Sequence, residues 1–494
     1  MSKNTAISTY PDVERILKDL DQLIRQPIYG ISPAATRGYV ADYFGKKCQK
    51  SYQLHQEAST IIPSGVQHNL AFHFPFPLAI ERAKGPYLYD VDGNEYLDFL
   101  QAGGPILLGN NPQELAQKVQ TFLSDCGPVT GLFHEYEYLL AKKIQELIPS
   151  VEKFRMLGSG NEAAMAAIRV ARLATGHKHI IKMGGAYHGW SDQLAYSLRI
   201  PYSRNLLTPG IPGNVFRYTE EFFPNRLEQL ERLLKRNRLR GGTAAIFMEP
   251  LGPESGTRPL LRNFNKNVES LSKKYGAALV FDEVVTAFRL GMGGAQEYFQ
   301  VHPDLTLFGK IIGGGYPSAG GLGGSNHMMK HLGAGLTDME VKSALVGGTM
   351  AANPLTSYAG YEALCQIEKT RAWEKAGAMA DLLTAGLKDL SQKYHLPFVI
   401  YNFGSIVHLQ SSAPMHFFID WKKPWTLPNL LKETTQRKEA LERMGAALMA
   451  EGLITLAGSR IYVSAAYDEA LIQEALSRFE RVFQKVENLE RNPE

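Results

Sequence analysis

The amino-acid sequence has few cysteines, no long apolar run and almost no excess of either charge. Its three cysteines, Cys48, Cys126 and Cys365, share no short spacing, so they predict neither a disulfide framework nor a zinc site. No apolar stretch approaches the roughly 18 residues that indicate a transmembrane helix, and the N-terminal residues have no apolar core of the signal-peptide kind. These absences exclude a membrane-spanning protein and a small secreted scaffold. We expect a cytoplasmic protein without a metal site.

The charge balance argues against two classes of partner. The 494 residues include 53 Lys and Arg against 49 Asp and Glu, and the net charge of +4 is close to neutral for this length. Composition therefore gives no support to a nucleic-acid partner or a membrane partner. At roughly 100–200 residues per domain, the length predicts two to four domains, or one large domain with a smaller companion.

The N-terminal part of the chain predicts helices followed by a hairpin. Apolar residues recur at helical spacing over 13–24, and a second, polar helical stretch covers 36–58. Residues 1–60 are therefore expected to form a helical arm that packs on the body of the protein or on a partner subunit. Two short strands are expected within 87–99, around an Asp-Gly-Asn turn. We assign 61–100 to the N-terminal part of a small domain.

Strand and helix patterns alternate in the middle of the chain, between residues 150 and 310. Alternation of this kind predicts an α/β fold with a mainly parallel sheet that is covered by helices on both faces. We assign 101–360 to this large domain, and 361–494, where amphipathic helices dominate, to a smaller C-terminal α+β domain. The predicted strands are 153–157, 179–183, 243–248, 277–281 and 305–308, and the clearest predicted helices are 161–174, 227–235 and 471–486.

A turn of small residues, Gly158-Ser159-Gly160-Asn161, joins the first of these strands to the helix after it. A helix N-terminus offers unpaired N–H groups and a positive dipole end, which suit a phosphate. The glycines allow a ligand to come close to the backbone, and the Ser159 hydroxyl can also donate. The alternative is that Ser159 only caps the helix while the glycines form a tight turn. This segment alone leaves both interpretations open.

The same segment also matches the G-x-G-x-x-G/A fingerprint of dinucleotide-binding proteins over 158–163. That fingerprint needs an acidic residue about twenty positions further on, at the end of the next strand. Here the next strand runs into Lys182-Met-Gly-Gly-Ala-Tyr187 and has no acid there, and Gly309-Lys310 is followed by isoleucine rather than by the Ser or Thr of a P-loop. A nucleotide cofactor is therefore weakly supported.

Two further residues follow apolar strands. Asp282 comes at the carboxyl end of its strand, where open α/β sheets bind ligands, and a buried carboxylate there needs a partner. Lys310 stands between an apolar strand and the glycines at 313–315. Most lysines are solvated charges, but apolar surroundings lower the pKa of a lysine and free its amine for Schiff-base chemistry.

Together these features suit one cofactor, pyridoxal 5'-phosphate (PLP). PLP needs a phosphate cradle, for which 159–161 is the candidate, and an aromatic neighbour, for which Tyr187 is the candidate. It also needs a lysine that forms an imine with its aldehyde, and a carboxylate that keeps the ring nitrogen protonated so that the ring withdraws electrons. Lys310 and Asp282 are the candidates for these two functions.

Several motifs in this order resemble the class III aminotransferases of fold type I, and most closely the glutamate-1-semialdehyde 2,1-aminomutase group. The resemblance runs from about residue 61 to 359 and continues more weakly to about 485. It rests on Ser159-Gly-Asn-Glu-Ala163, Gly185-Ala-Tyr-His-Gly189, Glu249-Pro250, Phe281-Asp-Glu-Val-Val-Thr-Ala-Phe-Arg289, Gly309-Lys-Ile-Ile-Gly-Gly-Gly315, and Gly348-Thr349 with Asn353-Pro354.

The resemblance implies a role for each of these residues. Lys310 is the catalytic residue and forms the Schiff base with PLP, and Asp282 pairs with the pyridine nitrogen. Tyr187 stacks on one face of the ring, and Val284 packs on the other. The fold implied is a large mainly parallel-sheet domain sandwiched by helices, with a smaller α+β domain built from both chain ends.

The resemblance also implies an obligate homodimer. Ser159, Gly160 and Asn161 hold the phosphate of PLP, aided by Thr349 from the other subunit. Asn161 departs from the family, which usually has Thr or Ser there, so a hydroxyl donor is lost.

The substrate side departs further from the aminomutases. Glu254 stands where they have an asparagine near a cofactor oxygen. The entrance segment 64–71 has no arginine, although aminomutases and related β-amino-acid aminotransferases place a carboxylate-binding arginine about there. His68 is the nearest match, and a histidine binds a carboxylate only when protonated. His68 could equally be structural.

We therefore predict a PLP-dependent aminotransferase. It would move an amino group from a small-molecule donor (an amino acid, β-amino acid or amine) to a small-molecule oxo acceptor, with Lys310 as the general acid and base.

Several alternatives remain open at this stage. An aminomutase of the glutamate-1-semialdehyde type would return the amino group to the same carbon skeleton. A dinucleotide-dependent oxidoreductase would use 158–163, and a catalytically inactive binding protein is disfavoured by the presence of Lys310 and Asp282. Residues 36–58 resemble the lead-in of aminotransferase domains in peptide synthetases, so a carrier-tethered substrate is also considered.

Overall fold

The computed structural model describes residues 5–333 and 341–490. The chain divides into two compact units. The first unit contains Gln113–Arg371 and Phe418–Pro424, together with Thr5. The second unit is built from both chain ends and contains Ala6–Pro112, Ala372–Phe417 and Trp425–Glu494. The domain boundaries drawn from the sequence at residues 60, 100 and 360 stay predictions.

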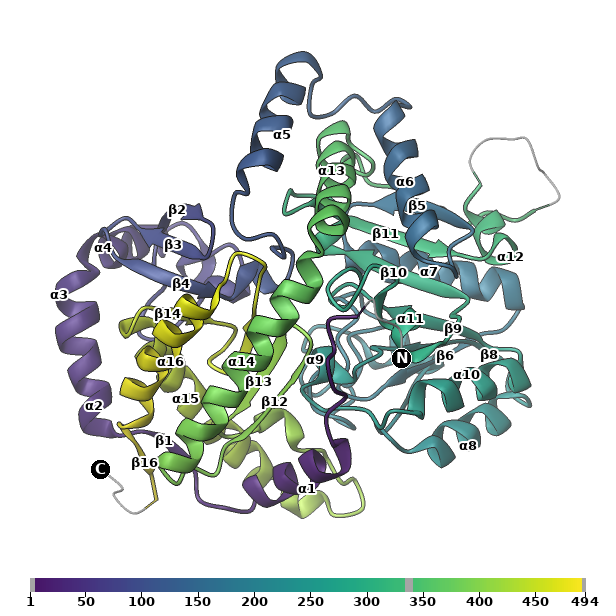
Figure 1. The fold of residues 1–494 in the computed structure, drawn as a ribbon. Helices are drawn as coiled ribbons and strands as arrows, with labels where there is room; N and C mark the ends of the chain where they lie inside the picture. The colour runs from purple at the N-terminus through teal and green to yellow at the C-terminus, as the bar shows by residue number, and fades with distance from the viewer. Residues whose placement is uncertain (1–4, 334–340, 491–494) are drawn as a thin grey trace. The chain divides into compact units, whose positions relative to one another are not determined.

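Within the described residues, the first unit is organised around a seven-stranded sheet of order β5-β11-β10-β9-β8-β6-β7 (Figure 1). The pairs β10–β9, β9–β8, β8–β6 and β6–β7 are parallel, and only β11 runs antiparallel to its neighbours. The predicted mainly parallel sheet is confirmed. The strands are β5 Lys153–Leu157, β6 His179–Met183, β7 Thr219–Phe222, β8 Thr243–Met248, β9 Ala278–Asp282, β10 Leu305–Gly309 and β11 Gly320–Gly324.

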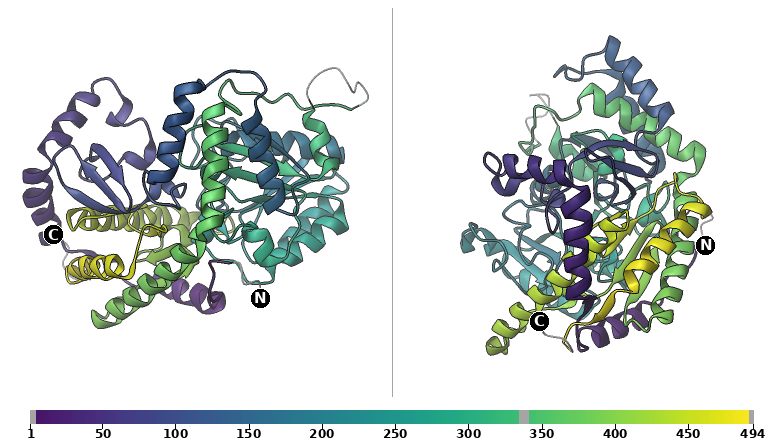
Figure 2. Two further views of the ribbon diagram at one scale, coloured as in Figure 1. Left: turned by 45° about the horizontal axis from the view of Figure 1, so that its top comes forward. Right: turned by 90° about the vertical axis from the view of Figure 1, so that its left-hand side faces the viewer.

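Helices cover both faces of this sheet, as Figures 1 and 2 show. Side chains alternate along β6, so that Ile180 belongs to a buried cluster with the alanines of α7, whereas Ile181 belongs to another cluster with side chains of α8 and α10. Burial on both faces explains why the central strands are mostly apolar. The helices of this unit are α5 Gln113–Asp125, α6 Glu135–Leu147, α7 Gly160–Thr175, α8 Leu227–Asn237, α9 Pro253–Gly256, α10 Phe264–Tyr275, α11 Gly294–Phe299, α12 Asn326–Met329 and α13 Pro354–Thr370.

Strand β11 was not predicted, because its sequence Gly-Gly-Leu-Gly-Gly has low strand propensity. A β-carbon at Gly320 would collide with the backbone of Ser159, and one at Gly321 would collide with the Phe154 ring. Glycine is needed here because a neighbouring segment approaches the strand closely.

The second unit contains three small sheets and several helices. One sheet has the order β14-β4-β3-β2, in which β3 and β4 form the predicted antiparallel hairpin. The others are β12-β13-β15 and the pair β1-β16. The strands are β1 Tyr29–Ile31, β2 Ile80–Lys84, β3 Tyr87–Asp90, β4 Glu95–Phe99, β12 Val399–Phe403, β13 Ile406–Gln410, β14 Leu453–Thr455, β15 Arg460–Tyr462 and β16 Val486–Asn488, and the helices are α1 Val13–Leu23, α2 Pro33–Gly38, α3 Gly45–Lys47, α4 Gln49–Ala58, α14 Ala372–Lys393, α15 Leu427–Ala450 and α16 Glu469–Phe483.

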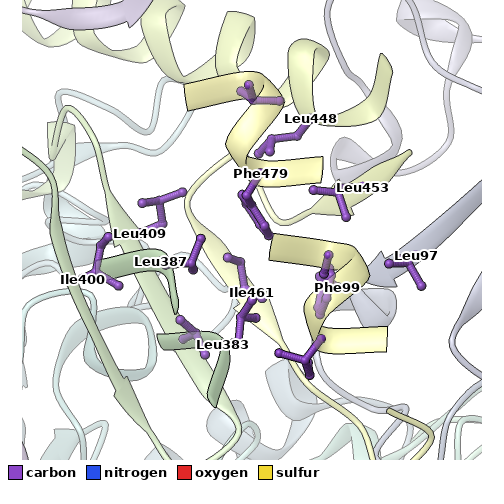
Figure 3. Packing of buried hydrophobic residues seen from close by; sticks show 14 of the residues in the cluster. Leu97, Phe99, Leu383, Leu387, Ile400, Leu409, Leu448, Leu453, Ile461 and Phe479 are labelled. Carbon is purple, nitrogen blue, oxygen red and sulfur yellow. The ribbon is translucent and has the colours of Figure 1, made fainter. Parts of the chain in front are cut away.

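A buried apolar cluster joins these elements (Figure 3). Phe99 of β4 packs near Phe479 of α16, with ring centroids 6.4 Å apart and the ring planes tilted by 47°. Leu387 of α14 and Leu448 of α15 belong to the same cluster and are fully buried. The cluster therefore connects segments that are far apart in the sequence.

Leu387 and Leu382 on α14 give a matched test of this core. Leu387 is 0% exposed and Leu382 is 40% exposed. We expect Leu387→Ala to lower the free energy of unfolding by about 2–5 kcal/mol because it leaves a cavity, and Leu382→Ala to change it by about 0.5 kcal/mol or less. Urea unfolding of both variants checks this, and equal effects would contradict the packing described.

Candidate active site

The predicted cofactor residues lie at the carboxyl ends of the strands of the first unit. Asp282 is the last residue of β9, and Lys310 directly follows β10. In the register of the sheet, Asp282 of β9 lies beside Leu307 of β10. Lys310 follows Leu307 closely along the chain, so Asp282 and Lys310 lie at the same edge of the sheet. Ser159 follows β5, and Tyr187 lies in the loop after β6. This edge is where open α/β sheets bind their ligands.

Lys310 has a left-handed backbone, with φ of 52°. It begins a short 3-10 turn, Lys310–Gly313, and its side chain is half-buried beside the buried Ile311 and Ile312. A left-handed backbone in a residue other than glycine is strained by about 1–3 kcal/mol and is found most often at functional sites. The turn directs the chain away from the sheet immediately after β10.

Val284 is close to both the phosphate turn and the lysine turn. A β-carbon at Gly160 would lie 2.8 Å from Cγ2 of Val284, and one at Gly309 would lie 3.0 Å from Cγ1. Side chains larger than hydrogen therefore do not fit at either position without movement. The structure brings together Gly160, Val284 and the residue before Lys310.

The phosphate turn is organised as a helix cap with free donors. The Ser159 hydroxyl accepts the N–H of Glu162 at 3.2 Å, and the Glu162 carboxylate accepts the N–H of Gly158 at 3.0 Å. Ser159 is therefore the N-cap residue of α7, so the capping interpretation of Ser159 holds. Among the described residues, the N–H groups of Gly160 and Asn161 have no hydrogen-bond partner. These unpaired donors at a helix N-terminus are also suited to a phosphate.

Asn161 uses its side chain within the protein. Its Oδ1 accepts the N–H of Ser191 at 3.0 Å, and this connects the phosphate turn to the loop after β6. A β-carbon at Gly189 would collide with the Asn161 side chain, and Gly189 has φ of 95°. The residue that departs from the family pattern therefore has a local structural function.

Asp282 is held by a histidine that the sequence analysis did not single out. His188 Nδ1 lies 2.8 Å from Oδ2 of Asp282, and the N–H of Val284 donates to Oδ1 at 3.1 Å. Both side chains are buried. Burial lowers the pKa of His188, and the hydrogen bond to Asp282 opposes this. The contact between Nδ1 of His188 and Asp282 orients the carboxylate. The only available signal was its place in the Gly185-Ala-Tyr-His-Gly189 motif.

Glu249 fastens two loops with one buried carboxylate. Its Oε1 accepts the N–H of Tyr187 at 3.0 Å and the N–H of Glu254 at 2.7 Å, and its Oε2 accepts the N–H of Ser255. Burial, followed by the nearby charge of Asp282, raises the pKa of Glu249 to about 8, although these backbone donors oppose the rise. The sequence indicated this residue only through the Glu249-Pro250 motif.

Lys182 holds the loop after β6 in place through hydrogen bonds to its backbone. Its fully buried ammonium donates to the carbonyl oxygens of Ala186 at 2.9 Å, Leu194 at 3.1 Å and Tyr196 at 2.7 Å. Burial lowers the pKa of Lys182 to about 8, and the charges of Glu221 and Glu249 oppose the change. A buried lysine with three acceptors holds irregular backbone in place.

The remaining predicted residues have the following positions. Tyr187 is 45% exposed, so part of its ring is free to contact a ligand. Glu254 is buried and pairs with Arg199 at 3.2 Å. Thr349 is exposed. His68 belongs to the second unit, where its Nδ1 accepts the N–H of Leu70 at 3.1 Å and caps a short turn.

Among the described parts of the chain, no cluster of three or more His, Cys, Asp or Glu residues could hold a metal ion. Across the same residues, no helix combines the length and apolar character needed to cross a membrane. The donor set at this edge of the sheet is instead a lysine, a carboxylate held by a histidine, and a turn with unpaired N–H groups.

This combination on a mainly parallel sheet defines a PLP-dependent enzyme of fold type I. Comparison with known families agrees: the sequence model of the family "Aminotransferase class-III" matches residues 71–482. The chain therefore belongs to the class III aminotransferases, and PLP is its cofactor.

Relatives of known name cover most of the chain. Glutamate-1-semialdehyde 2,1-aminomutase from Aquifex aeolicus is 34% identical over 437 residues, which is 87% of this chain and 98% of that protein. The enzyme of the same name from Desulforamulus reducens is 38% identical over 351 residues, 69% of this chain and 77% of that protein.

Solved structures share the fold. An omega-transaminase from Sphaerobacter thermophilus has a TM-score of 0.77 and 26% identity, covering 90% of this chain and 99% of that one. A glutamate-1-semialdehyde aminomutase from Pseudomonas aeruginosa in complex with PMP has a TM-score of 0.75 at 18% identity, covering 96% and 99%. The second likeness is one of fold alone.

Asp282 can be tested by removing its charge while keeping its shape. We expect Asp282→Asn to fold normally but to lose about 10²- to 10³-fold or more in turnover, since a neutral amide cannot hold a positive charge on the ring nitrogen. Steady-state amino transfer, with circular dichroism for the fold, checks this. Asp389→Asn, at an exposed position of α14, is the control. Turnover of Asp282→Asn near that of the control would contradict the assignment.

Proposed function

We propose that the protein is a PLP-dependent aminotransferase that moves an amino group between an amino compound and a separate oxo acceptor. The observation that carries this is a departure on the substrate side from the aminomutases. The entrance segment 64–71 has no arginine, and Glu254 stands at the position of their asparagine. The cofactor side, by contrast, has the lysine, carboxylate and glycine turn that PLP requires.

Lys310 would bind the cofactor covalently and exchange it for the incoming amine. When bound, PLP supplies a ring that withdraws electrons from the substrate carbon that carries the amine. Lys310, released at that point, would move a proton between that carbon and the cofactor as general base and then general acid. Its place on a strained turn after β10 supports this role by fixing where its side chain begins.

Asp282 would keep the proton on the ring nitrogen. The carboxylate accepts hydrogen bonds from His188 and from the N–H of Val284, and it has lone pairs left for a further donor. The buried position strengthens its interaction with a cationic ring nitrogen. His188 would act through Asp282, by holding its orientation.

The other cofactor contacts follow from the same edge of the sheet. The free N–H groups of Gly160 and Asn161, with the Ser159 hydroxyl, would bind the phosphate. Tyr187 and Val284 would lie on opposite faces of the ring. The closeness of Val284 to Gly160 and Gly309 supports its part in this arrangement.

The missing entrance arginine would change the substrate preference. A guanidinium–carboxylate pair contributes about 1.5–3 kcal/mol, so its loss at the entrance segment weakens a substrate whose carboxylate would bind there roughly ten- to a hundredfold. His68 would replace it only when protonated, and in the structure its Nδ1 accepts a backbone N–H. Glutamate-1-semialdehyde is therefore expected to be a poor substrate.

A second candidate function is an aminomutase. It is favoured by relatives named glutamate-1-semialdehyde 2,1-aminomutase, one of which matches at 34% identity over 98% of its length. Such an enzyme would return the amino group to the same carbon skeleton and would need no second substrate.

An amino-donor screen separates the two functions. Each donor is mixed with the PLP-loaded protein, and loss of the bound-cofactor absorbance and its recovery with an oxo acid are followed. We expect full cycles with separate donors and acceptors, a specificity constant for glutamate-1-semialdehyde below about 10⁴ M⁻¹s⁻¹, and no cycle with Lys310→Ala. A higher constant, with no transfer to any second substrate, would establish the aminomutase. Reaction only with donors attached to a carrier protein would indicate a tethered substrate.

We also propose that the active form is a homodimer. Several large apolar side chains of the first unit are exposed, including Phe133 at 82%, Trp190 at 74% and Leu345 at 86%. Large apolar side chains that are this exposed are ones that a partner subunit would cover. Thr349, which the family resemblance places at the partner's phosphate site, is exposed in the same segment as Leu345.

Thr349→Val tests the shared site. We expect the wild-type protein to sediment as a dimer, and Thr349→Val to bind PLP about ten- to a hundredfold more weakly because a hydrogen bond to a charged group is lost. Sedimentation velocity and cofactor titration check both points. Thr435→Val, at an exposed position of α15, should bind PLP as the wild type does. A fully active monomer would contradict the proposal.

A further inference from the structure

Arg199 is fastened beside the loop that carries Tyr187. Its backbone N–H donates to the carbonyl of Gly185 at 3.1 Å, and the N–H of Gly185 donates to the carbonyl of Ser197 at 3.0 Å. Gly185 and Leu198 form an isolated parallel bridge. Arg199 is therefore tied by main-chain hydrogen bonds to the segment that leads directly into Tyr187.

Glu254 is connected to the same segment through the carboxylate of Glu249. One oxygen of Glu249 accepts both the N–H of Tyr187 and the N–H of Glu254. Arg199 and Glu254 also form an ion pair with each other, in which Nε of Arg199 lies 3.2 Å from Oε1 of Glu254. Burial raises the pKa of Tyr187, with the charge of Glu254 adding to the rise and that of Arg199 opposing it. The pair therefore lies within electrostatic reach of the Tyr187 ring.

Arg199 and Glu254 differ in burial, and Arg199 has hydrogen-bond donors that the ion pair does not use. Glu254 is 9% exposed, whereas the Arg199 side chain is 65% exposed. Arg199 uses Nε for Glu254, and among the described residues its two terminal nitrogens have no hydrogen-bond partner. A guanidinium has five donors, and the two terminal nitrogens form a fork that matches a carboxylate. Held by Nε, Arg199 keeps this end free.

The backbone around the pair is strained. Arg199 has φ of 62°, Glu254 of 46° and Ser255 of 53°, all in the left-handed region. Such residues persist where the surrounding structure holds them, and they concentrate at ligand-binding sites. Solvent screens an ion pair whose arginine is 65% exposed, so the pair contributes little to stability and does not account for the strain on both sides of it.

We propose that Arg199 binds the carboxylate of a substrate through its terminal nitrogens, and that Glu254 orients Arg199 for this contact. The inference rests on the proposed transfer of an amino group and deepens it. It supplies a cation near the Tyr187 ring in a chain whose entrance segment has none. The favoured substrates are then amino acids whose carboxylate reaches Arg199, rather than the corresponding simple amines.

Matched donors test this. The pairs are β-alanine with propylamine, 4-aminobutyrate with butylamine and 5-aminovalerate with pentylamine, and the quantity measured is the ratio of kcat/KM for acid and amine. We expect the wild type to prefer the acid in at least one pair, and we expect Arg199→Gln to lower that ratio about ten- to a hundredfold by weakening the reaction of the acid more than that of the amine. Arg199→Lys should retain part of the preference, because the charge remains while the fork is lost.

Two further variants control the result. Glu254→Gln should lower the ratio less than Arg199→Gln, since it removes the orienting charge and leaves the guanidinium. Arg236→Gln, on α8 in a surface ion pair with Glu220, should leave the ratio unchanged. An unchanged ratio in Arg199→Gln, or no preference for any acid in the wild type, would overturn the inference.

Binding of glutarate separates failure of this inference from failure of the proposed function. Glutarate has carboxylates and no amine, so calorimetric titration into the PLP-loaded protein needs no turnover. We expect Arg199→Gln to weaken its binding at least tenfold. If no donor reacts but Arg199→Gln still weakens glutarate binding, the proposed amino transfer is wrong, and the inference that Arg199 binds a carboxylate is supported. If donors react and glutarate binds the wild type and Arg199→Gln equally, the inference about Arg199 is wrong and the proposed amino transfer is supported.

Discussion

The burial of the Asp282 carboxylate at the end of β9 is the constraint on which the rest of the site depends. A carboxylate there costs free energy unless surrounding groups donate to it. The N–H of Val284 and Nδ1 of His188 do so, and His188 is itself buried with a lowered pKa. Because His188 directly follows Tyr187, the partner of Asp282 also places the aromatic residue of the site.

The irregular loops at this edge are held by buried ionisable side chains. Loops that follow strands have backbone polar groups without regular partners, and these groups need acceptors and donors when buried. Glu249 supplies acceptors for the segments at Tyr187 and Glu254, and Lys182 supplies donors for the loop after β6. These hydrogen bonds fix the loops against the sheet. Fixed loops keep the residues that would contact a cofactor ring in position.

The second unit depends on contacts between distant parts of the sequence. Strand β14 pairs in parallel with β4, so that Leu453 lies beside Leu97. The apolar cluster then adds side chains from α14, α15 and α16. Each of these helices is amphipathic and has an apolar stripe that must be covered, and the covering elements come from both ends of the chain.

Local patterns in the sequence determined a large part of this protein. The predicted strands 153–157, 179–183 and 243–248 have those bounds in the structure, and the predicted helix 161–174 lies within α7, which Gly176 caps. Buried strands and capped helices carry their signals in neighbouring residues, so these predictions need no tertiary contact. The motifs around Lys310 and Asp282 are equally local, and they indicate PLP without any tertiary contact.

Only the tertiary structure decided which side chains meet. Glycine-rich β11 is a strand because it pairs with β10 and β5, and no propensity indicates this. His188, Glu249 and Lys182 stand out only when their burial and their partners are known, since a charged residue in a sequence is usually solvated. The pairing of Arg199 with Glu254 likewise joins two loops fifty-five residues apart. Sequence patterns report period and propensity along the chain, whereas these contacts depend on distances across it.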